Sequence, residues 1–188
     1  MRKYLIILVM IGLAAGSNYV VNGDFEQAFS NGWTEYSPGS YGYFSRGTTY
    51  DPDPNYEAYG YRSGSGGLGS GYDKLYQTFD IPITNLDFSA NVKLYAYETP
   101  GGSNWAAAAL VIYYRNENDA VIGVTRICRY TPGTPWSNTA TQHLIYASDT
   151  NWHNYSFNLE TELGNLSAVD PEDVAKITVA LLDTAYNC

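Results

Sequence analysis

Strict alternation between apolar and polar residues from Leu86 to Glu98 constrains the fold more than any other feature of the sequence. Successive side chains of a β-strand point to opposite faces, so one face of this segment must lie in a hydrophobic core. The residues predicted for that core face are Leu86, Phe88, Ala90, Val92, Leu94 and Ala96. The residues of the opposite face, which we expect to meet water or a ligand, are Asp87, Ser89, Asn91, Lys93, Tyr95 and Tyr97.

Shorter segments with the same period recur between clusters of Gly, Pro, Asn and Asp. Predicted strands cover residues 18–25, 75–81, 106–114, 120–130, 141–148 and 152–159. A last strand carries Ala175, Ile177, Val179 and Leu181 on its core face, with Asp183 on the same face near its end. Many short strands separated by turn residues are typical of an all-β sandwich. The sequence therefore predicts an antiparallel β-sandwich.

One short helix is predicted before the last strand. Asp170 has the side chain of an N-cap, Pro171 follows at the first helical position, and Asp173 stands where a capping box has Glu. Residues 37–74 are rich in Gly, Ser and Tyr and are expected to form loops and short strands.

The N-terminus has the pattern of a secretory signal peptide. Arg2 and Lys3 precede an uncharged apolar run, and the small residues Ala14, Ala15 and Gly16 follow it. The run is too short to span a hydrocarbon core of about 30 Å. We expect residues 1–16 to be removed, leaving one domain over 17–188 that is secreted or held at the cell surface and does not insert into a membrane. An uncleaved membrane anchor and a buried N-terminal strand are the alternatives.

The charge balance narrows the choice of partners. The chain has 10 Lys and Arg against 19 Asp and Glu, which gives a formal net charge of −9 at pH 7. A negative surface repels nucleic acid and anionic lipid, so we expect neither as a partner. The chain also contains 19 Tyr. Rigid amphipathic rings in such number are typical of extracellular binding surfaces.

The two cysteines are Cys128 and Cys188. In an oxidising compartment an even number of cysteines favours pairing, and we predict a disulfide between them. Such a bridge would attach the chain end to the predicted strand 120–130. Two unrelated buried thiols are the alternative.

The opening of the domain resembles a known family. The segment Val20-Val21-Asn22-Gly23-Asp24-Phe25-Glu26, followed by Asn31-Gly32-Trp33, is similar to the start of carbohydrate-binding modules of the galactose-binding-like jelly-roll type, such as families 4, 9 and 22. Residues 75–79, residues 152–157 and the last strand, which ends at Asp183, also resemble segments of that family. The resemblance covers most of residues 18–184. It implies a jelly-roll topology and a polysaccharide or surface glycan as the ligand.

The same resemblance implies a structural calcium ion, because in that family calcium commonly ties the first strand to the last. The matching residues are Glu26 and Asp183, with Asp24 as a further ligand. Calcium takes about 6–8 oxygen ligands from carboxylates and backbone carbonyls. The alternative is that Glu26 only accepts hydrogen bonds from the backbone amides of a turn. A zinc site is not expected, because His143 and His153 lack ligand spacing.

Glycan binding needs flat rings beside amide or charged hydrogen-bonding groups. The predicted ligand-binding residues are Asn91, Lys93, Tyr95, Tyr97, Trp105 and Trp136. Tyr41 and Tyr43 in the Tyr-rich region are possible additions, whereas Trp33 and Trp152 are expected in the core. The alternative is that these rings contact another subunit.

Nothing in the sequence points to catalysis. No G-x-S-x-G elbow, phosphate-binding loop or H-E-x-x-H pattern is present. Glu160 and Glu162 alternate onto one face, but they precede a loop and are expected in solvent. The sequence thus predicts a secreted, non-catalytic carbohydrate-binding module. A structural or adhesive surface protein, including a self-associating subunit, is the alternative.

Overall fold

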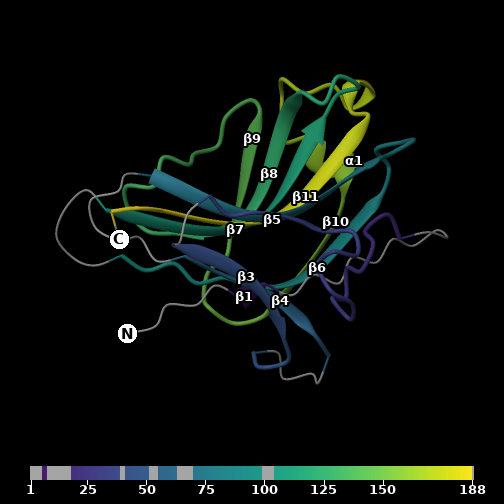
Figure 1. The fold of residues 1–188 in the computed structure, drawn as a ribbon. Helices are drawn as coiled ribbons and strands as arrows, with labels where there is room; N and C mark the ends of the chain where they lie inside the picture. The colour runs from purple at the N-terminus through teal and green to yellow at the C-terminus, as the bar shows by residue number, and fades with distance from the viewer. Residues whose placement is uncertain are drawn as a thin grey trace.

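The chain folds into a two-layer β-sandwich. The computed structural model describes residues 6–7, 18–38, 41–50, 55–62, 70–98 and 104–187. Figure 1 shows the two sheets as separate layers, and side chains from both form one continuous core. The predicted all-β sandwich is confirmed.

The five-stranded sheet has the order β10-β6-β1-β4-β3. Its strands are β10 (His153–Asn158), β6 (Asp87–Lys93), β1 (Ile6–Ile7), β4 (Glu57–Arg62) and β3 (Gly42–Gly47). The six-stranded sheet has the order β2-β5-β11-β7-β8-β9. Its strands are β2 (Thr34–Tyr36), β5 (Ser70–Asp80), β11 (Lys176–Tyr186), β7 (Trp105–Arg115), β8 (Val121–Tyr130) and β9 (Gln142–Tyr146).

Neighbouring strands are antiparallel with one exception. The strands β8 and β9 run parallel, with Val124 opposite Gln142 and Cys128 opposite Tyr146. Parallel neighbours require a crossover connection, and the segment 131–141 returns the chain to the beginning of β8. The other strand pairs agree with the predicted antiparallel sandwich, and this edge pair is the exception.

The helical segments differ from the prediction in detail. Asp170 and Pro171 begin only a 3-10 turn, η1 (Pro171–Asp173), in which the Asp170 side chain accepts from the Glu172 N–H. A short helix that the sequence did not predict, α1 (Leu159–Leu163), follows β10. It begins because the Asn158 side chain accepts hydrogen bonds from the N–H groups of Glu160 and Thr161.

The alternation in β6 places its side chains as predicted. Phe88, Ala90 and Val92 are buried in the core between the sheets, and the residues between them are more exposed. The strand ends at Lys93, so Tyr95 and Tyr97 follow it in an irregular segment. Trp33 is buried in the core, and Trp152 is partly buried against it, as expected.

The strand β1 belongs to the predicted signal peptide. Ile7 pairs with Ala58 of β4, and Ile6 pairs with Lys93 of β6. This arrangement matches the alternative of an N-terminal strand, and the other residues of 1–16 lie outside the described part of the chain. Removal of the leader would leave β4 and β6 without this strand between them. Signal cleavage stays a prediction. Among the described residues, no helix is long and apolar enough to cross a membrane.

Two carboxylates lie side by side in the interior at one end of the sandwich. Asp183 of β11 is opposite Asp73 of β5, and both are buried. Asp73 forms an ion pair of 2.5 Å with Arg62, whose backbone N–H donates to Asp183. Burial, followed by the charge of Asp73, raises the pKa of Asp183 well above its usual value.

The raised pKa predicts how stability depends on pH. An acid with a higher pKa in the folded state than in the unfolded chain binds more protons when folded between the two values. Stability therefore falls as the pH rises through that window, by about 1.4 kcal/mol per pH unit for one group. Asp183→Asn stays neutral and keeps an oxygen for the Arg62 N–H. We expect this variant to lose the decline and to unfold at higher urea concentration than the wild type at pH 7.

The matched control is Asp173→Asn, which changes an exposed carboxyl. Its urea-unfolding midpoints should follow the wild type from pH 4 to pH 8. Parallel pH profiles for Asp183→Asn and the wild type would contradict the buried neutral state of Asp183.

Candidate functional site

The outward side of the six-stranded sheet is apolar at its centre. In β7, Ala108, Leu110 and Ile112 point into the main core, so the alternate residues Ala109 and Val111 point outward. They form a second cluster of buried residues with Cys128, Ala180 and Leu182. The outer side of an antiparallel sheet is commonly polar. The departure from that pattern marks this side as a candidate interaction surface.

Aromatic rings from six strands and one loop surround this apolar floor. We call them the aromatic face, and they are Tyr36, Tyr72, Tyr76, Trp105, Tyr113, Tyr130, Trp136, Tyr146 and Tyr186. The strand registers put all the strand residues of this set on the outward side, and Trp136 packs on the floor from the β8–β9 loop.

The rings hold one another in place. Tyr36 stacks on Tyr72 with 5.3 Å between ring centroids, and Trp105 stacks on Tyr186 at 6.2 Å. Tyr130 meets the ring of Tyr146 edge to face at 5.2 Å. Such pairs contribute about 0.5–1.5 kcal/mol each beyond the area they bury. The aromatic face is thus preformed.

Two cations lie among these rings. Lys74 Nζ is 4.4 Å from the ring centroid of Tyr76, and the guanidinium carbon of Arg126 is 4.9 Å from that of Trp136. The Nε and Nη1 atoms of Arg126 are buried and make no hydrogen bond. Burial lowers the pKa of both residues, and the nearby Arg115 lowers that of Lys74 further. Between described residues, neither cation forms an ion pair.

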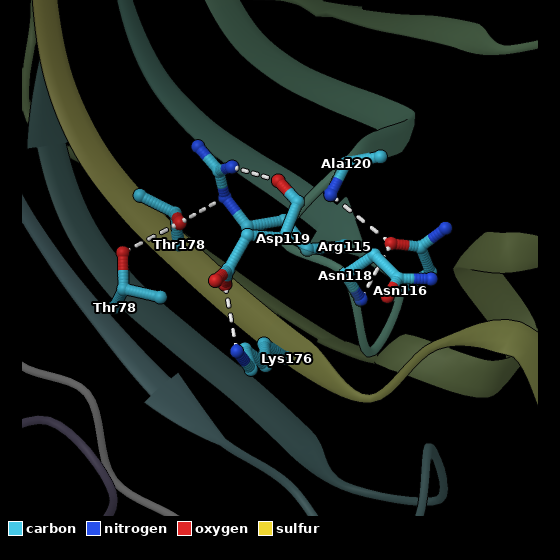
Figure 2. Close-up of polar contacts among 8 residues, drawn as sticks. All are labelled: Thr78, Arg115, Asn116, Asn118, Asp119, Ala120, Lys176 and Thr178. Atoms are coloured by element: carbon cyan, nitrogen blue, oxygen red, sulfur yellow. Dashed lines mark hydrogen bonds and ion pairs between the residues drawn. The ribbon is translucent and has the colours of Figure 1, made fainter.

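The polar end of the same side is fixed by hydrogen bonds. Figure 2 shows Arg115 at the end of β7, where its Nε donates to Thr178 Oγ1 over 2.8 Å. The Nη1 atom of Arg115 donates to the Asp119 carbonyl over 2.6 Å, and the Asp119 carboxylate pairs with Lys176 at 2.7 Å. Arg115 is therefore held at the edge of the aromatic face.

The β7–β8 turn supplies this support. Asn116 Oδ1 accepts from the N–H groups of Asn118 and Ala120 over 3.1 and 3.0 Å. Asp119 has φ 62°, a left-handed conformation that Asp tolerates better than most residues. The turn lies between the predicted strands 106–114 and 120–130.

The structure does not bring the six predicted ligand-binding residues together. Trp105 and Trp136 belong to the aromatic face. Asn91 and Lys93 alternate with core residues of β6, so they point outward from the five-stranded sheet on the opposite side of the sandwich. Tyr95 and Tyr97 are exposed just beyond the end of β6.

The other predicted aromatic residues lie on or next to β3. Tyr41 directly precedes β3, and Tyr43 in β3 is exposed and packs on the rings of Tyr59 and Tyr61. Sequence reasoning missed Tyr72 and Tyr76 in β5 and Arg126 in β8. The available signal was that β7 is apolar on both faces and that Tyr72, Lys74 and Tyr76 alternate with buried residues.

The structure separates the predicted calcium ligands. Glu26 Oε1 accepts from the Tyr56 N–H over 3.1 Å at the beginning of β4, whereas Asp183 accepts from Arg62 at its end. The six residues of β4 span about 20 Å at the usual rise of a strand. Asp24 is exposed and accepts from the Glu26 N–H. Glu26 and Asp183 therefore lie at opposite ends of β4.

Glu57 follows Tyr56, whose N–H donates to Glu26. Glu57 Oε1 accepts from the N–H groups of Thr49 and Tyr50 over 2.8 and 3.2 Å, and its Oε2 is buried without a hydrogen bond. An unpartnered buried carboxylate oxygen is compatible with a cation. Within the described residues, no group of three or more His, Cys, Asp or Glu side chains is placed to hold a metal ion.

Cys128 is a buried cysteine on the outward side of β8. Burial raises the pKa of this thiol to about 12. Its predicted partner Cys188 lies outside the described residues, so the disulfide stays a prediction.

Glu162 is buried in α1, contrary to the expectation that it lies in solvent. Its Oε1 accepts from Thr125 Oγ1 over 2.9 Å and contacts His143 Nδ1 at 2.5 Å, and Asn165 donates to its Oε2 over 3.0 Å. Both carboxylate oxygens therefore have hydrogen-bond partners. The contacts with Thr125 and His143 form a structural tie between α1 and the six-stranded sheet. The sequence pattern placed Glu160 and Glu162 on one solvent-facing side, whereas the helix α1 turns Glu162 inward.

Comparisons with known proteins give similarity of fold at a low level. No family model matches the sequence, and no curated protein matches it significantly. A family 11 carbohydrate-binding module from Clostridium thermocellum, in complex with a β-1,3-1,4-mixed-linked tetrasaccharide, is 13% identical over 87% of this chain and 89% of that chain, with TM-score 0.35. The enzymatically active domain of tailspike protein 4 from bacteriophage CBA120 is 12% identical over 90% of this chain and 20% of that chain, with TM-score 0.33. At these scores neither similarity carries a functional argument.

The Glu162 network predicts a stability effect at Thr125. Thr125→Val removes the hydroxyl that donates to Glu162 and lies 3.3 Å from the Tyr114 hydroxyl. Glu162 and Tyr114 then each lose a hydrogen-bond partner, which should lower the free energy of unfolding, measured with urea, by about 1–3 kcal/mol. The matched control Thr161→Val changes an exposed residue of α1 and should stay within about 0.5 kcal/mol of the wild type. Equal losses for both variants would contradict the structural tie.

Proposed function

We propose that the protein is a secreted, non-catalytic carbohydrate-binding β-sandwich module that binds glycan on the aromatic face. The observation that carries the proposal is the chemistry of that face. Its exposed large apolar side chains are the tyrosines Tyr36, Tyr72 and Tyr146, and the buried Nε and Nη1 atoms of Arg126 lie beside the Trp136 ring.

The proposal rests on what a sugar presents. A pyranose ring has an apolar patch of C–H groups that packs on a flat aromatic ring, surrounded by hydroxyls that hydrogen-bond. Tyr and Trp provide rigid contact area at low cost in side-chain entropy. Lys74 and Arg126 provide donors next to those rings. A sugar can therefore satisfy the rings and the donors at the same time.

The proposed lack of catalysis is supported by the state of the buried acids. Glycoside hydrolysis needs two carboxylates about 5–10 Å apart around the scissile bond. Glu162 is occupied by hydrogen bonds, and Asp73 and Asp183 lie in the interior between the sheets. The charged side chains that contact rings of the aromatic face, Lys74 and Arg126, are both cations.

The alternative function is a self-associating surface protein. Tyr, Trp and Arg are also enriched at protein–protein interfaces, and an apolar outer sheet face suits a second subunit. The chain offers a direct comparison, because Tyr95 and Tyr97 are exposed to a similar degree on a different part of the molecule.

We expect Tyr72→Ala combined with Tyr146→Ala to weaken polysaccharide retention about ten- to hundredfold, because two stacking rings are lost. Native affinity electrophoresis over a polysaccharide panel measures the retention, and light scattering measures the oligomer size. Both side chains are exposed, at 42% and 50%, so the fold should be kept.

The matched control is Tyr95→Ala combined with Tyr97→Ala, at residues exposed by 39% and 44%. We expect it to retain polysaccharide like the wild type. Loss of retention in the control alone would move the site to the five-stranded sheet. Loss of oligomer size, with no polysaccharide ever retained, would favour the structural protein.

A structural calcium ion remains part of the proposal, at the beginning of β4. Glu57, with its unpartnered Oε2, and Glu26 are the residues that would hold it. A ligand that binds only the folded state at a hundredfold excess over its Kd stabilises by about 2.7 kcal/mol. EDTA should therefore lower the Tm of the wild type but not that of Glu57→Gln, whereas Asp183→Asn should keep the sensitivity. Identical melting curves of the wild type with EDTA and with added calcium would exclude the ion.

A further inference from the structure

We propose that the aromatic face binds an acidic glycan, whose carboxylate or sulfate group pairs with Arg126. This inference rests on the proposed function and names the class of ligand for the same face. It reverses the expectation from the net charge of −9, which favours a neutral or cationic partner.

The first support is how charge is distributed. The outward side of the six-stranded sheet carries four cations, which are Lys74, Arg115, Arg126 and Lys176. Asp119 and Asp80 act on Lys176 at the hairpin end. Lys74 and Arg126 form no ion pair with another described residue. On an acidic protein, this side is where an anion is attracted.

The second support is the burial of Arg126. Two of its nitrogens are shielded from water and unpartnered, although buried polar groups in native proteins are nearly always hydrogen-bonded. Burying an ionised group without a partner is strongly unfavourable. The cost is explained if a ligand supplies the acceptor.

The third support is the surroundings of that guanidinium. Arg126 lies opposite Val111 in β7 and Leu144 in β9, above the apolar floor, with the Trp136 ring beside it. The phenol of Tyr113 is within electrostatic range of Arg126, Arg115 and Tyr72. A low-dielectric surrounding strengthens the attraction between a guanidinium and an anion. The planar fork of Arg matches a carboxylate or sulfate with two parallel hydrogen bonds, which a sugar hydroxyl cannot form.

The test compares ligands with one backbone and different charge. Polygalacturonate presents carboxylates, its fully methyl-esterified form presents the same backbone without charge, and dextran sulfate presents sulfates. Mixed-linked β-glucan serves as the neutral reference. Dissociation constants from affinity electrophoresis at 50 mM and 300 mM NaCl give the preference and its salt dependence.

We expect the wild type to bind polygalacturonate, dextran sulfate or both about ten- to hundredfold tighter than the neutral polymers at low salt, since hydrogen bonds to charged groups are the stronger ones. Tighter binding of polygalacturonate identifies a carboxylate as the group that is bound, and tighter binding of dextran sulfate identifies a sulfate. Arg126→Met should lose this preference, and Arg126→Lys should keep part of it. High salt should reduce acidic binding and leave neutral binding unchanged.

A stability measurement separates lost binding from lost folding. Arg126→Met removes two buried guanidinium nitrogens that make no hydrogen bond, so it should unfold at a urea concentration equal to or higher than the wild type. If that variant does not fold, Lys74→Gln provides the same comparison at the Tyr36–Tyr76 part of the face. Equal affinity of the wild type for polygalacturonate and its methyl ester, with no binding of dextran sulfate, would overturn the acidic ligand and leave glycan binding standing. Retention of none of the four polymers would overturn both.

Discussion

The pairing of β11 with both of its neighbours is the constraint on which the rest of the structure depends. All 11 residues of β11 are in register with β5 on one side and β7 on the other. Because side chains alternate along paired strands, this register decides at once which residues enter the core and which face outward. A slip of one residue in β11 would exchange Leu181 for Leu182 in the core, and a slip of one residue in β5 would place Lys74 there. The same strand pairing therefore determines both the main core and the aromatic face.

Different interactions act on the two sides of the six-stranded sheet. Between the sheets, burial of Leu110, Ile112 and Leu181 drives folding, and buried polar groups such as Glu162 are matched with donors. On the outward side, ring–ring contacts cover an apolar floor, and the buried Nε and Nη1 atoms of Arg126 make no hydrogen bond. Burial of an unmatched charge lowers stability, so its presence beside Trp136 fits a binding function better than a structural one.

Much of the fold could be predicted because side-chain direction is a local property. Alternation in β6 identified Phe88, Ala90 and Val92 as core residues, and Asp170 was recognised as a capping residue. Predictions failed where contacts between distant segments compete with local pattern. Glu162 is turned inward by a helix that Asn158 caps, and β9 lies parallel to β8 because of the path of the loop between them.

By itself the sequence determined that the chain is an all-β sandwich, which residues of each strand share a face, and that rings are abundant. Only the tertiary structure decided which rings meet. Tyr72, Tyr113 and Arg126 come from three strands, and strand order depends on pairing between segments far apart in the chain. Periodicity does not encode that pairing, so the sequence pointed to the polar face of β6 and not to the six-stranded sheet. Their difference arises because the register of β5, β11, β7 and β8 gathers rings and cations on one side.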